Sequence, residues 1–192
     1  MVDVRSALVS RVIASVGLLA FAATALAADL PSKFDPSRDA AADVAHAVAL
    51  AKAQGKRVIV DVGGEWCTWC HIMDRFIAAH DNVRSLLDAH YVWVKVNYSK
   101  QNPNEALLAR WPKVAGYPHL FVLDASGALV HSQDTSALES GRSYDAARFI
   151  AFLARWSTGG GRRASVVLHF HQRAHPRMDA ALEQVIAAAK AA

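Results

Sequence analysis

The chain has 192 residues, enough for one domain of ordinary size. Hydrophobic residues make up 53% and charged residues 20%, a composition that excludes a disordered or fibrous protein. Lys and Arg number 21 against 17 Asp and Glu, and the net charge of +4 is not concentrated in any basic run longer than two residues. Nucleic acid is therefore not an expected partner.

Residues 1–27 have the pattern of a secretory signal peptide. Arg5 and Arg11 precede an apolar stretch from Val12 to Ala28, and Ala25-Leu26-Ala27 places small residues at positions −3 and −1 of a cleavage point. The apolar stretch is shorter than the roughly 20 residues that a membrane span needs. We therefore expect a cleaved signal and a periplasmic or secreted protein; an uncleaved anchor and a buried N-terminal helix are the alternatives.

Residues 28–157 alternate between helical and extended patterns. Apolar residues at helical spacing predict helices at residues 37–54, 67–79, 82–89, 102–111 and 144–156. Short apolar or alternating runs predict strands at residues 57–62, 91–97, 119–123 and 128–132. Asp35 or Ser37 is expected to cap the first helix, Gly55 to end it, and Ser143 to cap the last helix.

The order of these elements predicts an α/β fold with a central mixed sheet of about four strands flanked by helices. A helical connection makes the first two strands parallel. The turn at residues 124–127, where Gly127 supplies a positive φ, makes the last two strands an antiparallel hairpin. Residues 158–192 begin with a Gly-rich hinge at 159–161 and form a C-terminal extension to which the sequence assigns no role.

Cys67 and Cys70, the two cysteines of the chain, lie three residues apart where a predicted strand gives way to a helix. A disulfide between them would close a very small loop and remove little entropy from the unfolded chain, so chemistry explains the pair better than stability does. Free N–H groups and the dipole at a helix start lower the pKa of a thiol from its ordinary value near 8.5. We therefore expect Cys67 to attack a partner disulfide and Cys70, one turn inside, to resolve the mixed disulfide.

The sequence Trp66-Cys67-Thr68-Trp69-Cys70 resembles thioredoxin-fold thiol–disulfide oxidoreductases, and most of all the exported bacterial thioredoxin-like proteins. The resemblance covers about residues 37–156 and implies the thioredoxin-like fold. Asp61, six residues before Cys67, falls on the buried acid that in this family aids proton transfer to and from the inner cysteine. Lys95 falls on the lysine that pairs with that acid.

The resemblance also implies a substrate-binding surface. Trp66 precedes the first cysteine as in thioredoxins, and Tyr117-Pro118 resembles the family's cis-proline loop, which binds substrate backbone. Thr68-Trp69 replaces the usual Gly-Pro between the cysteines, and Trp69 is expected to shield the disulfide or to form part of the docking surface. The implied partners are protein thiols and disulfides, with a membrane thiol relay as electron donor and no cofactor beyond the Cys67–Cys70 disulfide. The pairing of acid and lysine favours the reductase direction.

Three alternatives share the same residues. Cys67-x-x-Cys70-His71 is also the attachment motif of c-type haem, with His71 as axial ligand. The preceding strand, Asp61 and the Gly-Tyr-Pro loop favour a redox dithiol over haem, and a zinc site would need a second close pair of ligands. A thioredoxin-like binding module whose dithiol is incidental is the third alternative.

Overall fold

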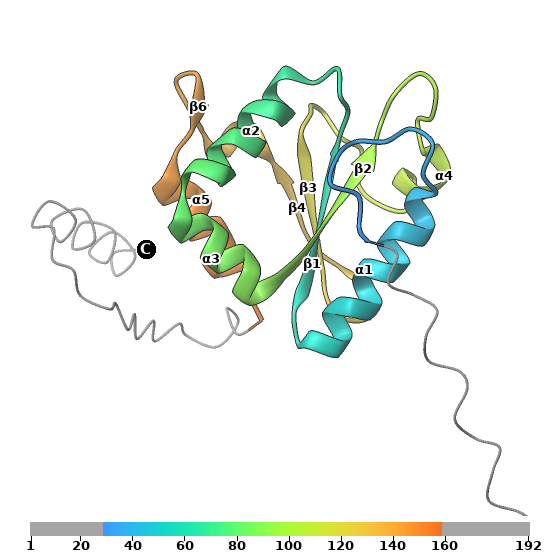
Figure 1. Cartoon of the computed structure of the whole chain (residues 1–192), viewed down its shortest axis with the longest axis horizontal. Helices are drawn as coiled ribbons and strands as arrows, with labels where there is room; N and C mark the ends of the chain where they lie inside the picture. Colours follow the sequence, from blue (N-terminus) through green and yellow to red (C-terminus); the bar gives the residue numbers. More distant parts are fainter. Residues whose placement is uncertain (1–28, 159–192) are drawn as a thin grey trace, which may run out of the picture.

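The computed structural model describes residues 29–158 (Figure 1). The predicted signal peptide, residues 1–27, and the C-terminal extension beyond residue 158 lie outside the described residues. Within residues 29–158 no helix is long and apolar enough to cross a membrane.

A four-stranded sheet runs through the centre of the domain in the order β2-β1-β3-β4. Its strands are β1 (Arg57–Gly63), β2 (Tyr91–Asn97), β3 (His119–Leu123) and β4 (Leu129–Asp134). β1 is parallel to β2 and antiparallel to β3, and β3 forms the predicted antiparallel hairpin with β4. The mixed α/β sheet is therefore confirmed, and Gly127 in its hairpin turn has the expected positive φ of 84°.

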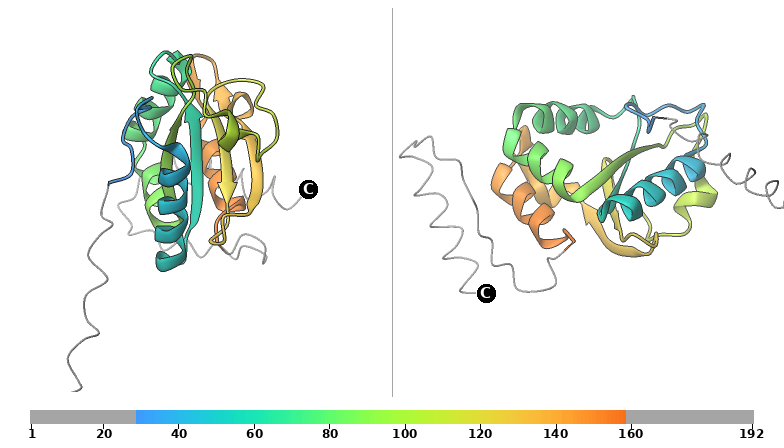
Figure 2. Two further views of the ribbon diagram at one scale, coloured as in Figure 1. Left: turned by 90° about the vertical axis from the view of Figure 1, so that its right-hand side faces the viewer. Right: turned by 60° about the horizontal axis from the view of Figure 1, so that its bottom comes forward.

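Helices cover both faces of this sheet (Figures 1 and 2). One face packs against α1 (Ala40–Gln54) and α4 (Glu105–Leu108), and the other against α2 (Thr68–Ala79), α3 (Asp81–His90) and α5 (Ala146–Arg155). Because side chains alternate along a strand, Val58, Val60 and Val62 of β1 face α1, while Ile59 faces the layer that contains α2. Asp61 follows the same alternation and lies on the α2 side.

Two of the predicted helix caps are wrong. The carboxylate of Asp35 accepts hydrogen bonds from the N–H and hydroxyl of Ser37, at 2.8 and 2.7 Å, so both residues form a local turn. Asp39 caps α1 instead, accepting from the N–H of Ala42 at 3.0 Å, and Gly55 ends the helix with φ 66° as expected. Asp145 rather than Ser143 caps α5, accepting from the N–H of Arg148 at 2.9 Å.

The chain before α5 also differs from the prediction. A 3₁₀ turn, η1 (Thr135–Leu138), leads into a two-stranded hairpin formed by β5 (Glu139–Ser140) and β6 (Ser143–Tyr144). Ser143 is engaged in this hairpin, whose turn contains Gly141 at φ 60°, and so cannot begin the helix. Strands of two residues are too short to produce a visible alternation in the sequence.

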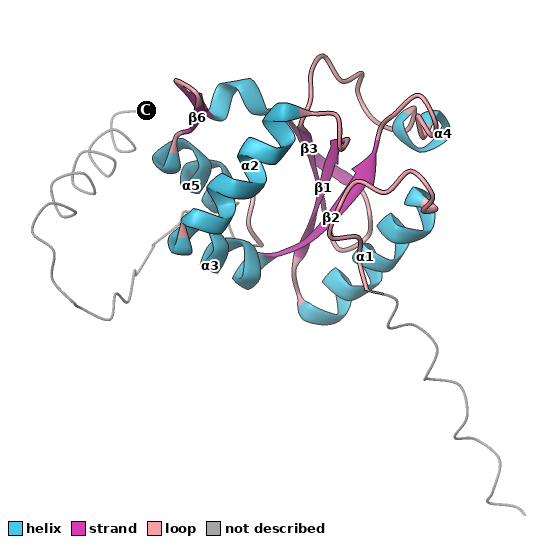
Figure 3. Cartoon of the chain, turned by 45° about the horizontal axis from the view of Figure 1, so that its top comes forward, coloured by secondary structure: helices cyan, strands magenta, loops and turns pink. Residues whose placement is uncertain are grey.

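The predicted helix at residues 102–111 shortens to the four residues of α4. Asn104, just before it, adopts a left-handed conformation with φ 50°, and the chain tightens after Leu108, with the N–H of Arg110 bonded to the carbonyl of Leu107. Pro112 disfavours helical geometry at the preceding residue, so the pattern cannot continue. The loops that join α4 to β2 and to β3 lie at the end of the sheet where β1 gives way to α2 (Figure 3).

Candidate functional site

Cys67 is the N-cap of α2, at the strand-to-helix junction where the sequence placed it. It is joined to Cys70 by a disulfide, and its sulfur accepts a hydrogen bond from the N–H of Cys70 at 3.1 Å. Cys67 is 3% exposed and Cys70 is fully buried. A sulfur that already receives an amide at a helix start is well placed to be stabilised as a thiolate after reduction.

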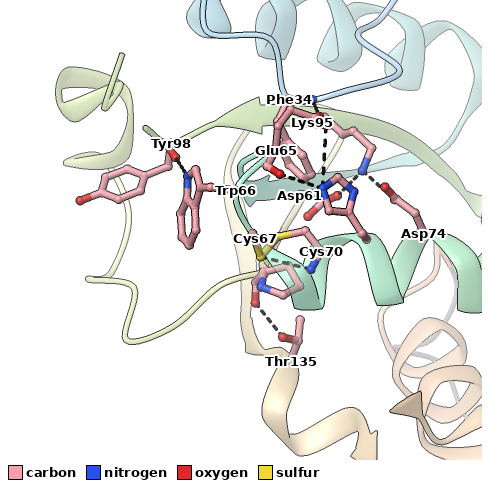
Figure 4. Close-up of a disulfide and its surroundings, with 12 residues drawn as sticks. Phe34, Asp61, Glu65, Trp66, Cys67, Cys70, Asp74, Lys95, Tyr98 and Thr135 are labelled. Atoms are coloured by element: carbon pink, nitrogen blue, oxygen red, sulfur yellow. Dashed lines mark hydrogen bonds and ion pairs between the residues drawn. A yellow bond between two sulfur atoms is a disulfide. The ribbon is translucent and has the colours of Figure 1, made fainter. Parts of the chain in front are cut away.

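Three aromatic residues surround the disulfide: Phe34 is buried against it, and Trp69 and Tyr117 are partly buried against the same cluster. The Tyr117–Pro118 peptide bond is cis, as the resemblance implied. The carbonyl of Pro118 accepts a hydrogen bond of 2.6 Å from the hydroxyl of Thr135, which Figure 4 shows beside the disulfide. The loop therefore reaches the dithiol, with Tyr117 in contact and Thr135 holding the carbonyl of Pro118.

An exposed aromatic surface lies next to Cys67. Trp66 is 58% exposed, and its indole N–H donates to the carbonyl of Tyr98 at 2.7 Å (Figure 4). Tyr98 stacks on Tyr117 with ring centroids 4.7 Å apart, and Trp66 meets Tyr117 edge to face at 5.7 Å. The structure thus brings together Trp66 and Tyr117, two residues for which we predict a role in substrate binding, and adds Tyr98, a residue directly after β2 that the sequence did not single out.

Trp69 points elsewhere. Its ring packs edge to face on Tyr144 of β6, with centroids 5.6 Å apart, and is partly buried. Of the two roles expected for Trp69, its contacts with the disulfide cluster fit shielding better than membership of the exposed aromatic surface around Trp66.

A buried acid and a lysine lie on the α2 side of the sheet. The parallel register pairs Asp61 of β1 with Lys95 of β2, and Lys95 Nζ donates to Asp61 Oδ2 at 3.1 Å, which confirms the predicted pairing. Asp61 has no exposed surface, and its Oδ1 has no hydrogen-bond partner. Burial raises the pKa of Asp61 to about 6, although the charge and hydrogen bond of Lys95 act in the opposite direction.

Lys95 has a second acidic partner that the sequence analysis missed. Its Nζ also donates to Asp74 Oδ1 at 2.7 Å, and the side chain of Asp74 is 41% exposed (Figure 4). Burial alone would lower the pKa of Lys95, but the charges and hydrogen bonds of Asp61 and Asp74 together raise it. Asp74 lies four residues after Cys70 in α2, and this helical spacing was the signal that could have revealed it.

Glu65 and His71 hold the segment before the cysteines. His71 Nε2 bonds to the carbonyl of Glu65 at 2.9 Å, and the Glu65 carboxylate accepts from the N–H of Phe34 at 2.8 Å. Phe34 belongs to the stretch before α1, where no periodic pattern drew attention to it. Among residues 29–158, no three or more His, Cys, Asp or Glu side chains cluster as they would around a metal ion.

Gly63, the last residue of β1, leaves the space in which Cys70 and Phe34 pack. A methyl group in its place would lie 2.5 Å from the sulfur of Cys70 and 3.0 Å from the ring of Phe34. We expect Gly63→Ala to lower the free energy of unfolding by about 1–3 kcal/mol, because neither neighbour has room to move. Urea denaturation measures this, with Gly116→Ala as control, since a methyl group at Gly116 meets nothing within 4 Å. Equal stability of the two variants would contradict the packing described.

A dithiol at the start of a helix close to a buried carboxyl group, on a mixed sheet covered by helices, is the arrangement found in thioredoxin-fold thiol–disulfide oxidoreductases, and the domain has the thioredoxin-like fold. Residues 39–125 match the thioredoxin-like family.

Known proteins of this class are similar to parts of the chain. The thiol:disulfide interchange protein DsbD of Klebsiella pneumoniae is 29% identical over 108 residues, which are 56% of this chain and 17% of that protein. DsbD of Yersinia pestis is 30% identical over 104 residues, 54% of this chain and 16% of that protein. The chain thus spans about a sixth of the length of these relatives. A disulphide isomerase structure from Xylella fastidiosa shares the fold, with a TM-score of 0.56 and 24% identity over 67% of this chain and 98% of that one.

Proposed function

We propose that the chain is an exported thiol–disulfide oxidoreductase that reduces disulfides in other proteins. The observation that carries the proposal is the dithiol at the start of α2, in which Cys67 caps the helix and Cys70 lies buried behind it. The partial similarity to thiol:disulfide interchange proteins supports the same chemistry. Export rests on the signal-like pattern of residues 1–27.

In the reduced protein, the Cys67 thiolate attacks one sulfur of a substrate disulfide. A bond forms between Cys67 and that sulfur, and the other substrate sulfur leaves as a thiolate that takes up a proton. Cys70 then attacks the sulfur of Cys67, the mixed disulfide breaks, and the second substrate thiol is released. Two electrons have passed from the dithiol to the substrate, and the protein is left with the Cys67–Cys70 disulfide.

Cys70 must lose a proton before it can attack. Asp61 is the acceptor we assign, because its buried carboxylate has a free oxygen and burial brings its pKa to about 6, close to neutrality. Lys95 holds this carboxylate on its other oxygen and keeps a positive charge beside it. The acid is thus able to take a proton from the inner thiol and to release it again at neutral pH.

Substrate is expected to lie across the aromatic surface next to Cys67. The exposed indole of Trp66 and the ring of Tyr117 offer apolar contact. The backbone that could meet an extended chain is that of Tyr117, before the cis proline, because Pro118 has no N–H and its carbonyl is bonded to Thr135. After each turnover the disulfide must regain two electrons. We assign this step to a dithiol donor, in an exported protein a membrane thiol relay, because the exterior of bacteria has no glutathione-type buffer.

The packing of the dithiol does not favour the haem alternative. Covalent haem attachment needs both sulfurs at a surface beside His71, but Cys70 has no exposed surface and lies against the space left by Gly63. The Nε2 atom of His71 is engaged by the carbonyl of Glu65. To bind a haem, Cys70 would have to leave its buried position and His71 would have to give up its hydrogen bond to Glu65.

The direction of the reaction is tested by the redox potential of the dithiol. We expect a redox potential of about −270 mV, as in thioredoxin, because the reduced protein is proposed to act as an electron donor. Equilibration with a series of dithiothreitol or glutathione ratios, followed by alkylation and mass measurement, gives the value. A potential of about −120 mV would instead indicate that the protein oxidises thiols in its substrates.

A further inference from the structure

The stretch before α1 reaches the redox site although it forms no regular element. Residues 29–39 pass beside the ends of β1 and β2 (Figure 1). They are fastened on both sides of Phe34: the N–H of Phe34 donates to Glu65 Oε1 at 2.8 Å, and Asn102 Nδ2 donates to the carbonyl of Pro36 at 3.0 Å. Phe34 is only 1% exposed. An irregular segment is thus used to bury one large ring at the site.

The ring of Phe34 packs against the two cysteines and also contacts Lys95, the basic member of the acid–lysine pair. It packs in one cluster with Cys67 and Cys70. The position of a methyl group on Gly63 would lie 3.0 Å from the ring and 2.5 Å from the Cys70 sulfur, so the ring and the inner sulfur border the same small space. Lys95 Nζ lies 4.1 Å from the ring centroid, within the range of a cation–π contact.

The ring stands where water would otherwise hydrate the lysine. An ammonium group has three N–H donors, and Lys95 directs two of them to Asp61 and Asp74. Phe34 meets the same ammonium and offers it no hydrogen-bond acceptor. Asp61 Oδ1 has neither a partner nor exposed surface. Most of the solvent contact that this group of charges retains is at the carboxylate of Asp74, whose side chain is 41% exposed, whereas the side chain of Lys95 is 7% exposed.

We propose that Phe34 is a positioning residue that excludes water from the Asp61–Lys95 pair and from Cys70, so that the proton of the inner thiol passes to Asp61 rather than to solvent. The inference rests on the proposed function and extends it to a residue outside the dithiol motif. The charged side chain that faces this pair is Asp74 of α2, and the titratable Tyr144 of β6 is near enough for the charge of Asp61 to contribute to its raised pKa. Glu65, before α2, accepts from the N–H of Phe34, and His71, in the first turn of α2, bonds to the carbonyl of Glu65.

The test compares Phe34→Ala with Phe34→Leu, which keeps an apolar volume but removes the ring. In Phe34→Ala, we expect the resolution of the mixed disulfide to slow by about tenfold at neutral pH, because water competes with Asp61 for the proton. Phe34→Leu should restore most of the rate. Leu30→Ala is the matched control, since Leu30 belongs to the same stretch but packs on the core formed with α1. Equal loss in Phe34→Ala and Leu30→Ala would reduce Phe34 to a structural role.

A second readout does not depend on turnover. In the oxidised protein, carboxyl carbon NMR follows the titration of Asp61, whose pKa burial raises to about 6. We expect this pKa to fall toward the ordinary range of an aspartate in Phe34→Ala and to stay near the wild-type value in Phe34→Leu and Leu30→Ala. An unchanged titration in folded Phe34→Ala would overturn the inference. A wild-type protein that titrates as expected but reduces no disulfide would instead overturn the proposed function alone.

Discussion

Cys67→Ser should lose the reduction of protein disulfides, by at least about a thousandfold in turnover of insulin as substrate. The serine hydroxyl cannot form a disulfide, and no described residue offers a second thiol, since both cysteines of the chain lie in the one bridge. Insulin precipitation with dithiothreitol as the electron source measures the loss. Retained turnover in Cys67→Ser would rule out Cys67 as the attacking thiol and with it the proposed mechanism.

Cys70→Ser is the matched variant, and its expected result differs in kind. Cys67 still attacks the substrate, but the buried partner that should release the mixed disulfide is gone, so the covalent complex accumulates. Non-reducing electrophoresis after mixing with a disulfide-containing protein should show this complex for Cys70→Ser and not for Cys67→Ser. Trapping by Cys67→Ser instead would reverse the two roles that the cap position and the burial of the sulfurs assign.

The sheet was predictable from periodicity, whereas the acid–lysine pair was predicted from the family resemblance and is explained by the register of the strands. The alternating run Tyr91–Asn97 matches β2 residue for residue, and the helical connection predicted that β1 and β2 are parallel. Once two strands are parallel and in register, residues that share a face must meet. Asp61 and Lys95 meet in this way, 34 positions apart in the chain.

The remaining partners depend on packing that no single segment encodes. Asp74 reaches Lys95 only because α2 is rotated so that the turn after Cys70 faces the end of β2. Phe34 comes from a stretch without period, and Tyr98 joins the aromatic surface through its stacking on Tyr117. The misplaced caps have a local cause: Asp35 and Ser37 satisfy one another, which leaves the N-cap to Asp39.

The buried acid should cost the fold stability, and the cost should depend on pH. Burial raises the pKa of Asp61 from 3.8 to about 6, so between these values the folded protein holds a proton that the unfolded chain has lost. Stability therefore falls as pH rises through this window and stays lower above it. The shift of about two units corresponds to about 3 kcal/mol. The amide side chain of the Asp61→Asn variant does not titrate. Between pH 4 and pH 7 the wild type should therefore lose about 2 kcal/mol of its free energy of unfolding relative to the variant.

Urea denaturation of the oxidised proteins at both pH values measures this difference, and the ion pair with Lys95 needs no separate correction because its effect is already contained in the pKa of Asp61. Asp74→Asn is the control, because it removes the exposed acid bonded to the same lysine. The charge of Asp74 raises the pKa of Asp61, so in this variant the free energy of unfolding should still fall with rising pH, but over a slightly narrower pH range than in the wild type. The Asp61→Asn protein, whose stability should depend less on pH, should nevertheless resolve mixed disulfides about a hundredfold more slowly, since Cys70 has lost its proton acceptor. A buried acid that weakens the fold and speeds the reaction is retained for the reaction. Loss of both stability and rate in Asp61→Asn would make Asp61 a structural anchor for Lys95 instead.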